Sequence, residues 1–215
     1  MLDIVGEYGP RLVVGLLTTA RIALLAFALA FLFGLLIAAF RVSPVPPLVR
    51  AAGLYVTFFR NIPLAVLMIL VFFVLPDLDL GLSGFWSAVL ALSLYSGAYL
   101  AEIIRSGINT VAAGEVEAAR AVGLTFTQVL GLIVLPQALR SVVAPIGSLF
   151  IAHTKNTTVA ALISAGELGD FTRRAGSASA NYFTVALLVA IVFVVILVPT
   201  GSLFGVLERR VAIKR

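Results

Sequence analysis

Five long apolar stretches constrain the fold of this chain more than any other feature. They lie at residues 12–40, 52–75, 84–106, 138–155 and 182–206, with more polar segments between them. Each has roughly the length of a helix that crosses the hydrocarbon core of a bilayer, where backbone groups must be paired within the protein. The sequence therefore predicts an all-α integral membrane protein with about five transmembrane helices, of which the fourth has the weakest apolar stretch.

The composition supports this class and excludes others. Of the 215 residues, 61% are hydrophobic and 12% are charged, which lies outside the range of soluble domains. We expect residues 1–215 to form one transmembrane domain, and the first apolar stretch is too long for the core of a cleaved signal peptide. With no cysteine and one histidine, the sequence offers no disulfide and no metal cluster, and its basic residues are too scattered for nucleic-acid binding.

The distribution of basic residues predicts how the chain crosses the membrane. If residues 107–137 are cytoplasmic, nine of the fifteen Lys and Arg residues lie inside, four lie outside and two lie within spans. Because cytoplasmic segments carry an excess of Lys and Arg, we expect the N-terminus outside and the C-terminus inside. Residues 76–83 and 156–181 are then external, and we expect the small-residue patch at 175–180 to be a loop.

Residues 114–137, GEVEAARAVGLTFTQVLGLIVLPQ, form the one long segment that leans polar. Acids in its first turn, a run of alanines and Gly123 predict a short helix that ends at a left-handed glycine. Thr125 and Gln128 have the spacing of a capping box, so a second helix starts there, and Pro136 ends the apolar run. A helix of about two turns is not stable alone in water, so we expect it to dock on a partner.

This segment resembles the EAA loop in the membrane subunits of binding-protein-dependent ABC importers. In that family the loop is a cytoplasmic coupling helix that rests in a groove of the ATPase subunit. Without the resemblance, the segment would be interpreted as an ordinary amphipathic helix between two spans. The resemblance implies that the following residues couple this chain to an ATPase: Glu117, Ala118, Ala119, Gly123, Ile133 and Pro136.

Three further segments resemble the polar amino-acid branch of the same permeases, and the one around Arg60 and Pro63 is similar to its glutamate-type members. Arg60, Asn61 and Pro63 lie within the second apolar stretch and predict a cavity-lining cation beside a helix kink. The alternative is an arginine whose side chain reaches the cytoplasmic interface. Glu102 lies three residues before Arg105, so the two share a helix face, and we expect a structural ion pair.

The third of these segments follows the fourth apolar stretch. Lys155 could meet an anionic group there, and the sequence Asn156-Thr157-Thr158 offers donors at a possible half-helix start, a geometry that suits carboxylates. We interpret His153 as a packed histidine rather than a proton-coupling group. The candidate substrate path therefore consists of residues from all three segments: Arg60, Asn61, Pro63, Glu102, Lys155, Thr157 and Thr158.

The sequence contains no phosphate-binding G-x-x-x-x-G-K-S/T loop, and neither a catalytic triad nor a pair of carboxylates that would indicate an enzyme. ATP and Mg would therefore bind to another polypeptide. The resemblance implies a type I ABC importer permease fold in a prokaryotic cell (inner) membrane, acting on a polar amino acid such as glutamate. It also implies three kinds of protein partner: an ABC ATPase, a second permease subunit that is identical or paralogous, and an extracytoplasmic substrate-binding protein.

Two other functions stay open from the residues alone. A secondary transporter or channel that works without an ATPase would use Arg60, Glu102 and Lys155 as an ion path. A membrane scaffold would show no substrate flux at all.

Overall fold

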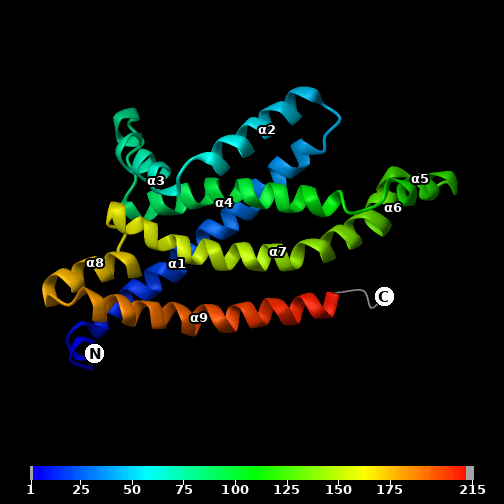
Figure 1. Ribbon diagram of the computed structural model, residues 1–215. Helices are drawn as coiled ribbons and strands as arrows, with labels where there is room; N and C mark the ends of the chain where they lie inside the picture. Colours follow the sequence, from blue (N-terminus) through cyan, green and yellow to red (C-terminus); the bar gives the residue numbers. More distant parts are fainter. Residues whose placement is uncertain (1, 212–215) are drawn as a thin grey trace.

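The computed structural model describes residues 2–211, and every regular element within that range is helical (Figure 1). The elements are, in chain order, α1 (Leu2–Arg41), α2 (Pro46–Asn61), α3 (Leu64–Phe73), the 3-10 helix η1 (Leu75–Leu78), α4 (Gly84–Ile108), α5 (Ala113–Ala121), α6 (Phe126–Val129), the π-helical turn η2 (Leu130–Val134), α7 (Leu135–Asn156), the 3-10 helix η3 (Thr157–Ile163), α8 (Leu168–Ser179) and α9 (Tyr182–Val211).

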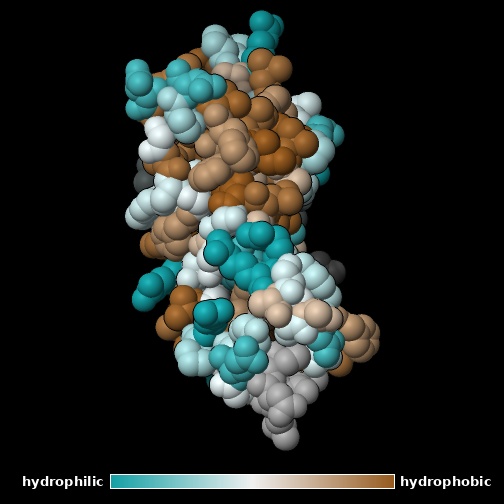
Figure 2. Space-filling model, turned by 90° about the vertical axis from the view of Figure 1, so that its left-hand side faces the viewer, coloured by the Kyte–Doolittle hydropathy of each residue, from teal (hydrophilic) through white to brown (hydrophobic). Residues whose placement is uncertain are grey.

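The molecule has two distinct ends along the direction of its long helices. The first turns of α1 and α9 lie beside α8 at one end, called here the α8 end, whereas α5 and α6 project at the opposite α5 end (Figure 1). Figure 2 looks onto the α8 end and shows a hydrophilic patch across the middle of that face, at the level of α8, with a large hydrophobic surface above it.

Four helical segments are long and apolar enough to cross a membrane: Val5–Arg41, Gly84–Ile108, Phe126–Ile163 and Tyr182–Arg210. A fifth span arises only if α2 and α3 are counted together, because they meet at an angle of 103°. The break falls at Pro63, which lacks a backbone donor and restricts the residue before it to an extended conformation. Ile62 has that conformation, with ψ at 133°, so the kink predicted at Pro63 is confirmed and is large enough to divide the predicted second span.

Helix α4 lies at the centre of the bundle and packs closely along α1. A side chain on Gly34 of α1 would come within 2.6 Å of the Cβ atom of Leu100, so only glycine permits this approach. Two turns nearer the α8 end, the Ser93 hydroxyl of α4 donates to the Ala26 carbonyl at 3.2 Å. Small residues and short hydrogen bonds of this kind hold helices together where lipid removes the hydrophobic driving force between them.

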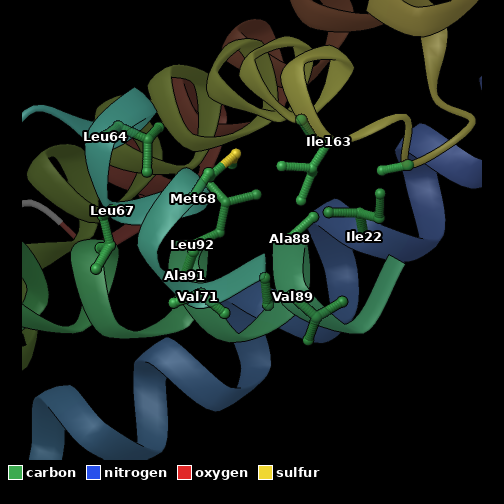
Figure 3. Close-up of a cluster of buried hydrophobic side chains, with 13 residues drawn as sticks. Ile22, Leu64, Leu67, Met68, Val71, Ala88, Val89, Ala91, Leu92 and Ile163 are labelled. Carbon is green, nitrogen blue, oxygen red and sulfur yellow. The ribbon is translucent and has the colours of Figure 1, made fainter. Parts of the chain in front are cut away.

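Helix α3 completes the core at the α8 end of the bundle. Its residues Leu67 and Met68 pack with Ile22 of α1, Leu92 of α4 and Ile163 of η3 in one buried apolar cluster (Figure 3). Although α3 has only ten residues, this packing fixes its position.

The expectation that the patch at 175–180 forms a loop was wrong, because the external segment at 156–181 contains η3 and the twelve-residue helix α8. The small-residue patch at 175–180 belongs largely to α8, since alanine and serine without a breaker between them continue the helix. The carboxylate of Glu167 starts α8 by accepting hydrogen bonds from the backbone N–H groups of Gly169 and Asp170.

The predicted half-helix start at Asn156-Thr157-Thr158 was also wrong. Helix α7 continues directly into η3 because the two threonine hydroxyls bond to the preceding turn instead of freeing its backbone. Thr157 donates to the Thr154 carbonyl at 2.7 Å, and Thr158 donates to the Lys155 carbonyl at 2.8 Å. The first new helix start after Lys155 is therefore the one at Leu168.

We expect Glu167 to make the stability of the fold depend on pH. It lies between the last two candidate spans with its side chain fully buried. Burial raises the pKa of Glu167 from 4.5 to about 7, against the lowering effect of the two N–H groups it caps. The folded chain thus favours the protonated form, and stability should fall by up to about 3 kcal/mol as the pH rises through the window between these two values.

Thermal unfolding in detergent at pH 5, 6, 7 and 8 would measure this effect, with Glu167→Gln as the matched variant. The melting temperature of the wild type should decrease across this range, whereas that of the variant should change less. Parallel curves for the two proteins would contradict the assignment.

Candidate functional site

The coupling segment predicted from the sequence forms a short helix at the α5 end. Helix α5 stops at Gly123, whose φ of +89° lies in the left-handed region that favours glycine. The N–H of Gly123 donates to the Arg120 carbonyl at 3.0 Å, and that of Leu124 donates to the Ala119 carbonyl at 3.1 Å. These two bonds form a Schellman motif, so the predicted helix stop is confirmed.

A second helix start follows immediately, as predicted. The Thr125 side chain accepts from the backbone of Gln128, and the Gln128 side chain accepts from the backbone of Thr125. Pro136, which ends the apolar run of the sequence, does not end the helix, because it lies in the first turn of α7. The π-helical turn at 130–134 provides the reason: it already breaks the α-helical bonding pattern, so a residue without an N–H group fits there.

A groove of about 870 Å³ separates α5 from the start of α7. One polar bond crosses it, from the Gln137 amide to the Glu115 carboxylate at 2.6 Å. Four of the six predicted coupling residues line the groove, namely Ala118, Ala119, Ile133 and Pro136.

The predicted coupling residues differ in accessibility. Ala119 is only 6% exposed, so it packs within its own chain and offers little to a partner. Ala118 and Glu117 are exposed, and Glu117 lies outside the groove. Two large apolar residues of the segment are also strongly exposed, Val122 at 79% and Phe126 at 68%. The sequence did not single out these two residues, although their places beside the glycine stop and in the capping box could have indicated them.

A second charged site is centred on Glu102 of α4, which gathers arginines from three helices. Its carboxylate lies 3.1 Å from Arg41 at the end of α1 and 3.0 Å from Arg105 one turn along α4. Arg60, in the last turn of α2, lies 3.9 Å away. The predicted pair with Arg105 is confirmed. Arg41 was missed because it lies 61 residues from Glu102 in the sequence, although its position at the end of the first span could have suggested it.

These charges surround a pocket of about 380 Å³ with a mostly polar wall. The guanidinium of Arg60 lies 5.3 Å from the centre of the Tyr99 ring, and the Asn61 amide donates to the Thr57 carbonyl at 2.6 Å. Three arginines meet one carboxylate, so two positive charges remain without an acidic partner among the side chains described, those of residues 5–210. The Nε atom of Arg41 is also buried without a hydrogen-bond partner in this part of the chain.

The structure brings only part of the predicted substrate path together. Arg60, Asn61 and Glu102 line this pocket. The other four residues lie elsewhere: Pro63 precedes α3, Lys155 lies in the last turn of α7, and Thr157 and Thr158 begin η3. Of these, Lys155 is exposed and Thr157 is fully buried.

His153 of α7 is a buried link between three helices. Its Nε2 atom lies 3.1 Å from the Ala23 carbonyl of α1, and its Nδ1 atom lies 2.7 Å from the Ser96 hydroxyl of α4. Because a carbonyl only accepts, Nε2 carries the proton and Nδ1 accepts from Ser96. These contacts agree with the interpretation of His153 as a packed residue.

Among the described residues, no group of three or more His, Cys, Asp or Glu side chains could hold a metal ion.

Known proteins resemble this chain along nearly its whole length. Residues 13–213 match the family described as "Binding-protein-dependent transport system inner membrane component". The probable glutamine ABC transporter permease protein GlnP of Bacillus subtilis is 36% identical, over 89% of this chain and 91% of that protein. The glutamate transport system permease protein GluC of Corynebacterium glutamicum is 35% identical, over 97% of each chain.

Solved structures agree with these relatives. The crystal structure of an amino acid ABC transporter with histidines contains a chain that is 31% identical, with a TM-score of 0.91 over 97% of both chains. An inward-facing structure of the MetNI methionine ABC transporter has a TM-score of 0.79 at 22% identity, which shows the shared fold alone. The chain thus belongs to the binding-protein-dependent inner-membrane permease family: it is a multi-pass permease subunit of an ATP-driven amino-acid importer, and the ATPase of that importer is a separate subunit.

Proposed function

We propose that this permease forms the translocation path for a polar amino acid with an acidic side chain, such as glutamate, and that α5 couples this path to the ATPase. The observation that carries the proposal is the pocket at Glu102, where three arginines surround one carboxylate. The permease would act as one domain, with a second permease subunit and an extracytoplasmic binding protein. ATP and Mg would bind to the ATPase.

The surface of α5 supports docking on a protein partner. A nine-residue helix has too few backbone hydrogen bonds to be stable in water without packing. Here Glu117 and Ala118 are exposed beside the apolar side chains of Val122 and Phe126. A partner that covers this apolar surface would stabilise both α5 and the complex. If that partner is the ATPase, the α5 end lies in the cytoplasm and the α8 end lies outside the cell.

The charge of the Glu102 pocket supports an acidic substrate. Two unpaired guanidinium charges in a partly buried cavity favour a ligand with negative charge, and Arg60 is the most exposed of the three arginines. Lys155, Thr157 and Thr158 would contribute to the path nearer the α8 end. The glutamate transport function of the relative GluC is consistent with this choice of substrate.

Coupling would then follow from a two-state equilibrium. Closure of the two ATPase subunits around ATP would draw the two α5 helices together, and the permease pair would change from an inward-facing to an outward-facing cavity. Nucleotide biases the populations of these two states, and the permease itself needs no catalytic group.

We expect Gly123→Asp and Glu117→Lys to uncouple ATP hydrolysis from transport. At Gly123 the positive φ makes any side chain costly, by roughly 1 kcal/mol or more, so the end of α5 would shift. Glutamate uptake into proteoliposomes should fall at least about tenfold, a loss of 1.4 kcal/mol in coupling, while the amount of inserted protein stays unchanged.

Gly114→Asp is the matched control, because Gly114 has open space around it and lies in the first turn of α5, where an acid is favourable. This variant should transport at close to the wild-type rate. Normal uptake by the Gly123→Asp variant would refute the role of α5.

We expect Arg60→Gln to change substrate preference. Glutamate and glutamine differ in charge but hardly in shape, so loss of one guanidinium should lower the ratio of glutamate to glutamine uptake by about tenfold. Arg60→Lys should restore part of this ratio, because lysine keeps the charge without the planar geometry.

Arg50→Gln provides the control, since Arg50 lies on the same helix and does not line the pocket. Competitive uptake of the two labelled amino acids gives the ratio directly. An equal loss for both substrates in Arg60→Gln would show that Arg60 supports the fold and does not select the substrate.

A further inference from the structure

We propose that a pocket at the α8 end holds the headgroup of an anionic phospholipid from the adjoining membrane leaflet. This pocket is separate from the Glu102 site and has a volume of about 630 Å³. Its wall comes from the start of α1 and from α8, and it combines cationic, aromatic and aliphatic side chains: Tyr8, Arg11, Val14, Asp170, Phe171 and Arg174.

Two arginines of the pocket have guanidinium N–H groups that could still bind an anion. Arg11 is exposed, lies 5.9 Å from the centre of the Tyr8 ring and has no ion pair with a described residue. Arg174 donates from Nε to the Asp170 carboxylate at 2.8 Å, and its two terminal nitrogens make no hydrogen bond within residues 2–211. Asp170 is the only acid in the wall, and Arg173 also pairs with it, at 2.6 Å. The pocket wall therefore carries two guanidinium groups against one carboxylate, with Glu7 beside it as a hydrogen-bond partner of Tyr8.

An apolar face of α1 continues from the pocket toward the α5 end. Val14, Leu25, Leu32 and Leu36 are exposed on it at helical spacing, and Arg21 lies among them. This continuity of a cationic pocket with an apolar face matches the two parts of a phospholipid, a phosphate and its acyl chains.

Arg21 provides an independent reason for a phosphate at this level. It is exposed within an apolar stretch and makes no ion pair with a described residue, an arrangement that is costly in a membrane unless the guanidinium reaches a headgroup. Side chains on a helix lean toward its N-terminus, so Arg21 is directed toward the pocket. Ten residues separate it from Arg11, which is about 15 Å along the helix. A phosphate between these two levels can meet Arg21 on one side and Arg11 with Arg174 on the other.

The position of α8 is consistent with this role. Figure 2 shows a hydrophilic patch on the end face of the molecule at the level of α8. Phe171 and Ala175 are buried against the bundle, while Arg173 and Arg174 are largely exposed.

Native mass spectrometry of the assembled transporter, equilibrated with mixed phosphatidylglycerol and phosphatidylcholine, tests the proposal. The wild type should retain phosphatidylglycerol in preference to phosphatidylcholine. R11Q and R174Q should each reduce this preference by about fivefold, the effect expected of one arginine beside an anionic lipid. R173Q is the matched control, because Arg173 is adjacent and also pairs with Asp170 but does not line the pocket. It should change the preference by less than about twofold.

Val14→Glu gives a second variant that leaves every arginine in place. Val14 is 61% exposed, so the substitution should be tolerated by the fold, and its negative charge should displace the lipid. Equal retention of both lipids by the wild type would overturn the proposal, as would equal losses in R173Q and R174Q. Displacement of the lipid by millimolar inorganic phosphate would show that the acyl chains do not contribute. Loss of the second permease subunit in R11Q and R174Q, with lipid retention unchanged, would assign the pocket to a protein carboxylate instead.

Discussion

The position of α2 depends on the carboxylate of Glu102. The bend at Pro63 separates α2 from α3, so α2 has no long straight span to align it with the bundle. Its second half is held instead by Arg60 beside Glu102 and by the Tyr55 hydroxyl, which donates to the Leu94 carbonyl at 2.8 Å. Glu102 also binds Arg41 and Arg105, so one acid fixes the ends of α1 and α2 against α4. Removing one partner from such a partly buried cluster leaves charges uncompensated, so the cluster supports the fold. Because it has more arginines than acids, it also leaves positive charge for a ligand.

The two halves of the broken span have different surroundings. Helix α3 lies in the apolar cluster with Leu92 and Ile163, whereas α2 places Arg60 and Asn61 in a polar pocket. Pro63 itself is exposed, but Asn61 just before it lines the pocket and Leu64 just after it is buried in the core. The break therefore places a charged pocket next to an apolar core.

Local rules and hydropathy predicted much of this structure. The apolar stretches located α1, α4, α7 and α9, and Gly123 with Thr125 and Gln128 correctly marked where α5 stops and α6 starts. The errors arose where a residue has two possible hydrogen-bond partners or where contacts are distant in sequence. Threonine hydroxyls that could cap a new helix bond back to α7, and the contact between Arg41 and Glu102 has no local signal. The helix α8 was missed because its start depends on tertiary contacts. The Glu167 side chain caps its first turn, and the Thr19 hydroxyl of α1 accepts from the Leu168 N–H.

The segment from Phe126 to Ile163 has a consequence for how motion could travel through this permease. It contains 38 residues of continuous helix, in which a π-helical turn and a 3-10 turn join α6, α7 and η3 without a loop. At the usual rise per residue, this is a rod on the order of 50 Å long. A tilt imposed beside α5 therefore meets no loop before the residues that precede α8, and the π-helical turn and Pro145 are the breaks in α-helical bonding at which the rod can bend.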